Sequence, residues 1–180
     1  MSGQLTQVGA QILANKIAGN DVPYIGTSAP GSWIPGQPWI NDTTNPPVTY
    51  SYNGTSWVTG SAGRYVALLT ASPFTSGSGG TNAETISDLV ELATTGYSRV
   101  SVTFSDAAAS YPAPVSNSSV LTFGPMGAAM TLAAQWAALV TASTGTTGLL
   151  LYYWQLDTPQ QVSVSQSIQI PIGDLQLTEA

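Results

Sequence analysis

The chain has 180 residues, of which 7% are charged, and it contains no cysteine and no histidine. The usual groups of nucleophilic, acid–base and zinc chemistry are therefore absent or scarce, and three cations against nine carboxylates leave no basic patch for nucleic acid or an anionic membrane surface. A hydrophobic share of 43% is still enough for a core. We expect a folded protein that is not an enzyme, has no cofactor or metal, and has no membrane span or export signal. Because a monomer normally keeps a more charged surface, we also expect a homo-oligomer.

Residues 1–25 are predicted to form an N-terminal arm with one short helix. Apolar residues recur at helical spacing over residues 4–18, and Gly19-Asn20-Asp21 follows as a stop signal. Leu5, Val8 and Ile12 lie on the apolar face and are candidate interface residues. Two alternatives stay open: the helix packs on its own domain, or it docks to a partner.

Residues 26–63 form a region rich in proline and tryptophan, which we treat as a separate hairpin unit. Asn53-Gly54 between Tyr52 and Trp57 predicts a tight type I′ turn. The aromatic residues of this region are a second set of interface candidates, because such residues dominate interface energetics: Trp33, Trp39, Tyr52 and Trp57. The alternative is a local cluster in which these four side chains only cover one another.

Residues 64–180 predict a mainly β domain. Short strands with turn signals between them are typical of an antiparallel sandwich, and we expect a jelly-roll-like arrangement. The expected strands are 64–70, 98–104, 119–123, 131–140, 148–156, 162–164, 167–170 and 175–177, with turns at 113–114, 124–125, 145 and 157–159. Residues 84–94 and 126–140 are compatible with either helix or strand.

The two arginines of this region are expected to have structural partners. Arg64 and Arg99 would each form a bidentate pair with Asp106, Glu91 or Glu84 and so order the strand ends. Binding of an external acid is the alternative.

Two further patterns are weak signals of function. Three carboxylates lie near predicted strand ends, but nothing in the sequence brings two of them together as a glycosidase would need: Asp106, Asp157 and Asp174. Three glycosylation sequons, at Asn41, Asn53 and Asn117, are what chance gives in a chain rich in serine and threonine.

Several segments together resemble a known group of proteins. They are the N-terminal apolar segment, Tyr65-Val-Ala-Leu-Leu-Thr-Ala-Ser-Pro73, Gly96-Tyr-Ser-Arg-Val-Ser-Val-Thr-Phe104, Asn117-Ser-Ser-Val-Leu-Thr-Phe123, Trp136, Gly148-Leu-Leu-Leu-Tyr152 and Ile168-x-Ile170-Pro171-x-Gly173-x-Leu175-x-Leu177. This order resembles small virion proteins of tailed bacteriophages, called head decoration, head fibre or tail-fibre-like proteins. Residues 26–63 look like an insertion, and residues 162–166 lack the Gly-Asp turn usual in that group.

The resemblance implies a structural protein of the virion, assembled in the host cytoplasm. Our first hypothesis is a capsid decoration (cement) protein on the capsid surface, a homotrimer that binds the major capsid protein. The second is a tail-fibre or receptor-binding protein that contacts host surface glycans. A free carbohydrate-binding module or hydrolase is the third.

Overall fold

A computed structural model describes residues 3–5, 24–26, 38–41, 43, 48–52, 57–59, 63–73, 85–105 and 115–177. Within these ranges the chain is mainly β, as expected, and its only helix is the single-turn 3₁₀ helix η1 (Ile86–Asp88). No helix in this part of the chain has the length and apolar character needed to cross a membrane.

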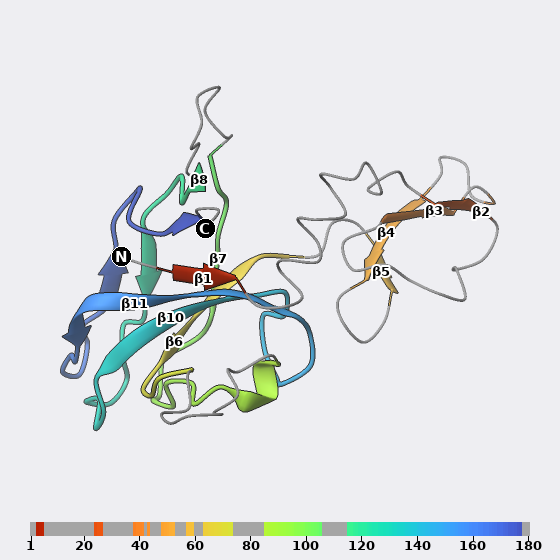
Figure 1. Ribbon diagram of the computed structural model, residues 1–180. Coiled ribbons are helices and arrows are strands. Elements are labelled where there is room, and N and C mark those ends of the chain that lie inside the picture. The colour runs from red at the N-terminus through yellow and green to blue at the C-terminus, as the bar shows by residue number, and fades with distance from the viewer. Residues whose placement is uncertain are drawn as a thin grey trace, which may run out of the picture.

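The main sheet has five strands, each antiparallel to its neighbours, in the order β1-β11-β10-β6-β7 (Figure 1). They are β1 (Gly3–Leu5), β6 (Tyr65–Leu69), β7 (Val100–Ser101), β10 (Ala134–Val140) and β11 (Leu150–Gln160).

The central strands are continuous apolar runs because both faces of the sheet are buried. In β6, Val66 and Leu68 belong to one hydrophobic cluster, and Ala67 and Leu69 belong to a second cluster on the opposite face. Residues 136–140 of β10 follow the same alternation, which explains why this alanine-rich segment is a strand: a single helix would bury only one stripe of it.

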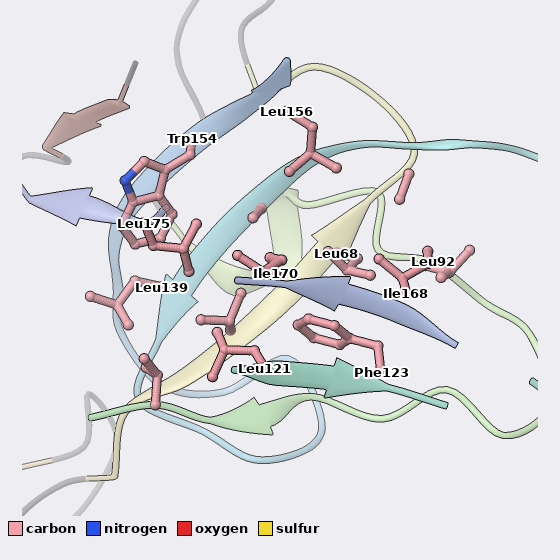
Figure 2. Close-up of a cluster of buried hydrophobic side chains, with 14 of the residues drawn as sticks. Leu68, Leu92, Leu121, Phe123, Leu139, Trp154, Leu156, Ile168, Ile170 and Leu175 are labelled. Carbon is pink, nitrogen blue, oxygen red and sulfur yellow. The ribbon is translucent and has the colours of Figure 1, made fainter. Parts of the chain in front are cut away.

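Two short ladders form a second layer over the first cluster. β9 (Leu121–Phe123) pairs with β12 (Ile168–Ile170), and β8 (Val115–Ser116) pairs with β13 (Gln176–Leu177). Figure 2 shows side chains of β9 and β12 gathered beside those of the main sheet, with alternate residues pointing inward. These four strands form two separate ladders and not one four-stranded sheet as in a jelly roll, so the jelly-roll connectivity stays a prediction.

Three local expectations were wrong. The predicted N-terminal helix included Gln4 and Leu5, which instead belong to β1 because they pair with the edge of β11. The rest of the predicted helix, residues 6–18, lies outside the described ranges. The predicted turn at 157–159 is part of β11, whose Gln160 still pairs with Ala134. Residues 162–164 are not a strand, since their backbone bonds to the loop at Met130.

The described part of the ambiguous segment at 84–94, residues 85–94, forms neither a long helix nor a strand. After η1 it runs extended beside β6, where Glu91 forms an isolated bridge with Leu69.

A separate four-stranded sheet combines three strands of the proline- and tryptophan-rich region with one strand, β2 (Tyr24–Gly26), from the end of the segment that was assigned to the N-terminal arm. Its order is β2, β3 (Pro38–Asn41), β4 (Val48–Tyr52) and β5 (Trp57–Thr59), with β2 and β3 parallel. The predicted hairpin is present as β4–β5, but Tyr52 pairs with Trp57. The loop between the two strands therefore spans four residues and not the predicted two, and the residues of this loop, 53–56, lie outside the described ranges.

Asn117 joins the second layer to the C-terminal segment. Its side chain is 0% exposed, and its amide donates to the carbonyls of Ser119 and Pro171, each at 2.8 Å, while its Oδ1 accepts from the Leu175 N–H at 2.9 Å. Every polar atom of the side chain is satisfied, so this sequon has no free amide to be glycosylated.

We expect Asn117→Ala to lower the free energy of unfolding by about 3 kcal/mol, because it leaves buried backbone groups without partners. Urea denaturation followed by fluorescence measures the change. Gln169→Ala removes an exposed amide with one 3.4 Å contact, to Thr122, and should change stability by less than about 0.5 kcal/mol. Equal losses in the two variants would contradict this role of Asn117.

Candidate interaction surfaces

The best-defined polar cluster is an ion pair between Arg99 and Glu91. Arg99 Nε and Nη2 donate to the Glu91 carboxylate at 3.0 and 2.7 Å, which is the bidentate arrangement, and the Arg99 side chain is 4% exposed. The guanidinium also reaches the loop between β10 and β11: Nη1 donates to the Ala142 carbonyl at 2.9 Å, and Nη2 donates to the Gly145 carbonyl at 2.7 Å as well as to Glu91. The predicted pairing of Arg99 is confirmed with Glu91 as partner, and the guanidinium is committed to internal groups.

Arg64 lies half-buried just before β6, where its Nη1 donates to the Gly63 carbonyl at 3.4 Å. Burial lowers the pKa of this guanidinium from its usual value. Two of the predicted acidic partners, Asp106 and Glu84, lie outside the described residues.

Tyr97 connects this ion pair to the main sheet. Its hydroxyl donates to Glu91 Oε1 at 2.8 Å and accepts the Leu68 N–H at 2.9 Å, and its ring stacks on Phe123 with centroids 6.3 Å apart. Burial and, next, the charge of Glu91 raise the pKa of the Tyr97 phenol far above its usual value of 10.0. The Tyr97 hydroxyl thus accepts the Leu68 N–H, a hydrogen bond that the carbonyl of a neighbouring strand would otherwise accept.

Residues 90–102 cover the whole outer edge of β6. The Thr70 N–H donates to the Val90 carbonyl at 2.9 Å, the Leu92 N–H to the Leu68 carbonyl at 2.8 Å, and the Val102 N–H to the Arg64 carbonyl at 2.8 Å. An unpaired edge invites association with other strands, so this arrangement closes one side of the sheet.

The turn at Thr95 and Gly96 within this segment is packed tightly on a second loop, at residues 125–127. A Cβ at Gly96, where φ is +84°, would lie 2.4 Å from the Pro125 carbonyl oxygen, and the Gly127 N–H donates to the Thr95 carbonyl at 2.7 Å. Only glycine fits at residue 96, and the two loops form a fixed platform.

An apolar groove of about 500 Å³ lies on this platform. Val90 and Leu132, which are 56% and 60% exposed, line it together with alanines and threonines of residues 93–95 and 128–131. Exposed apolar side chains gathered in one groove are typical of a contact surface.

A second, polar groove of about 230 Å³ lies between β11 and β12. Its polar lining consists of Asp157, Thr158, Gln160, Gln169 and Asp174, and apolar side chains such as Leu156 and Ile168 complete it. The fold therefore places in one groove two carboxylates, Asp157 and Asp174, that the sequence did not bring together.

No group of three or more acidic side chains that could hold a metal ion occurs in the described ranges. The carboxylates that the structure does describe are in capping, ion-pair or groove positions, such as Asp88, which accepts the Thr85 N–H at 2.9 Å.

The family model for podophage GP4 fiber I protein gp80 matches residues 44–178, which is more than half of the chain. The chain belongs to this gp80 fibre family. It is thus a structural protein of a tailed-phage virion, as the resemblance implied. No curated protein matches the chain.

The family match begins at residue 44, inside the region that we treated as an insertion, and includes strands β4 and β5 of the small sheet. In that sheet Trp39 is 8% exposed and meets Trp57 edge to face, with ring centroids 6.0 Å apart. Tyr52 is paired with Trp57 in the β4–β5 ladder. The interface role of these three residues stays a prediction.

Of the four remaining interface candidates, the structure describes only Leu5, and only its backbone. Leu5 pairs through its backbone with Tyr152, and Val8, Ile12 and Trp33 lie outside the described residues. Sequence reasoning on this gp80-family chain missed Tyr97 and the apolar groove. Glu91, Tyr97 and Arg99 lie close together in the sequence, but only the fold shows that their side chains meet beside β6.

We expect Tyr97→Phe to lower the free energy of unfolding at pH 8 by about 2 kcal/mol, since the Leu68 N–H and the Glu91 carboxylate each lose a hydrogen bond. Tyr152→Phe is the matched control. The Tyr152 hydroxyl is buried and has no hydrogen-bond partner, so its removal should raise stability or leave it unchanged. Urea unfolding measures both.

The same pair of variants tests the pKa of Tyr97. A raised pKa in the folded state gives stability that is present below pH 10.0 and is lost as pH rises above it, because only the unfolded chain then releases the proton. The advantage of the wild type over Tyr97→Phe should fall by about 1.4 kcal/mol per pH unit above that point. An advantage that stays constant to pH 11 would contradict the shift.

Proposed function

We propose that the protein is a fibre subunit of the virion rather than a cement protein of the capsid. The observation that carries this proposal is the match of residues 44–178 to a podophage fibre protein, a range that includes the main sheet except β1 and the whole second layer. In this proposal the subunit acts through its surfaces and catalyses no reaction.

The described geometry supports a role as a rigid subunit. The strand edge of β6 is closed by residues 90–102, and the loops around Gly96 and Gly127 are locked together. A fibre subunit must keep its shape while neighbouring subunits and host surfaces act on it, and hydrogen-bonded loops on a buried sheet provide that stiffness.

We further propose that the subunit forms a homo-oligomer, with a trimer as the first expectation. Val90 and Leu132 expose apolar surface in the groove, and subunit contacts commonly bury such surface. The low overall charge fits the same assembly.

The location on the virion decides between fibre and cement. We suggest inserting a short epitope tag between Thr146 and Thr147, which are exposed in the loop between β10 and β11, and labelling intact virions with gold-conjugated antibody. Label on tail-associated fibres is expected. Label spread over the capsid surface would favour the cement hypothesis, in which the partner is the major capsid protein. Untagged phage is the control and should carry no label.

Contact with host surface glycans would use the polar groove, because carboxylates and amides can hydrogen-bond sugar hydroxyls. The groove is smaller than the roughly 300–1,000 Å³ of typical ligand pockets, so we expect weak binding of one sugar unit. A glycan array should show signals that Asp174→Asn reduces about tenfold while Asp88→Asn, which removes the same charge from η1, leaves them unchanged. Binding unaffected by Asp174→Asn would rule out this groove.

A further inference from the structure

β1 is separated from the next strand of the main sheet by the longest stretch of sequence in that sheet. It covers the outer edge of β11 with Gly3 opposite Trp154 and Leu5 opposite Tyr152 (Figure 1). Residues 6–64 separate it from β6, the next strand of that sheet, and the strands formed within this interval pair only with one another. β1 is therefore not joined to its neighbour β11 by a hairpin turn.

The edge that β1 covers needs a partner. Tyr152, Tyr153 and Trp154 are all buried, so their backbone groups on that side would lack hydrogen bonds if β1 were removed. Any strand with the sequence of β1 can supply these bonds, whether it comes from the same chain or from a second copy.

The remainder of the β11 edge is unsuited to further pairing. Asp157 and Pro159 follow in the same strand, and a charged residue and a residue without an N–H are the two common means of protecting an edge. On this side the site that accepts a strand therefore ends soon after Trp154, and β1 pairs there with Gln4 opposite Tyr153.

We propose that β1 is exchanged between copies, so that residues 3–5 of one subunit pair with residues 152–154 of its neighbour. This inference rests on the proposed oligomeric fibre. Exchange keeps every contact of β1 and changes only which chain provides it, so its free-energy cost is small once neighbours are held close together. The long interval between β1 and β6 gives the reach, and each exchanged strand links two subunits in a chain that has no cysteine for disulfides.

The test uses the full chain with the photo-crosslinker p-benzoylphenylalanine in place of Gln4, which lies opposite Tyr153. Isotopically light and heavy copies are unfolded together in equal amounts, refolded and irradiated, and the cross-linked peptides are read by mass spectrometry. With exchange, roughly half of the cross-links between residue 4 and residues 152–154 should join a light to a heavy peptide. The control places the crosslinker at exposed Gln135 of β10, whose amide donates to the Thr70 carbonyl at 3.1 Å, and should give only uniform isotope pairs.

Light scattering on the same sample separates the two proposals. An oligomer with only uniform cross-links from residue 4, or with none to residues 152–154, overturns the exchange and leaves the fibre role standing. A monomer overturns the exchange and also counts against an oligomeric fibre subunit.

Discussion

The contact on which much of the described structure depends is the bidentate pair of Arg99 and Glu91, with Tyr97 beside it. Arg99 is one of only three cations in the chain, and it is nearly inaccessible to solvent. It joins the segment that covers β6 to the loop between β10 and β11. Removing one partner would leave a buried charge without compensation, which costs far more than an exposed pair contributes. The edge of the main sheet and one wall of the apolar groove are thus held by the same few atoms.

The low charge of the chain is compatible with a stable fold because its buried polar groups satisfy one another. Asn117 bonds to three backbone groups, and Tyr97 serves as both donor and acceptor. The hydroxyl of Tyr152 is the exception among the buried side chains that the structure describes. Hydrophobic burial on both faces of the main sheet supplies the principal driving force, so few surface ion pairs are needed.

The family places this architecture in a phage virion, where proteins act chiefly through contacts with other subunits. The proposed exchange of β1 follows from how the two edges of the main sheet are covered. One edge, at β6 and β7, is closed by residues that follow in the same chain, whereas the other, at β11, is closed by a distant three-residue strand. Such an edge gives a subunit a specific way to join its neighbour, because strand pairing fixes both register and direction.

The sequence alone determined the mainly β class, the approximate positions of most strands within residues 64–177 and the pairing of Arg99 with an acidic residue. These features depend on local apolar alternation or on the scarcity of cations, and both are visible along the chain. Only the tertiary structure decided that residues 4 and 5 are strand, that residues 157–159 continue β11, and that Asp157 and Asp174 share one groove. These features arise where segments far apart in sequence meet, and local spacing contains no information about such meetings.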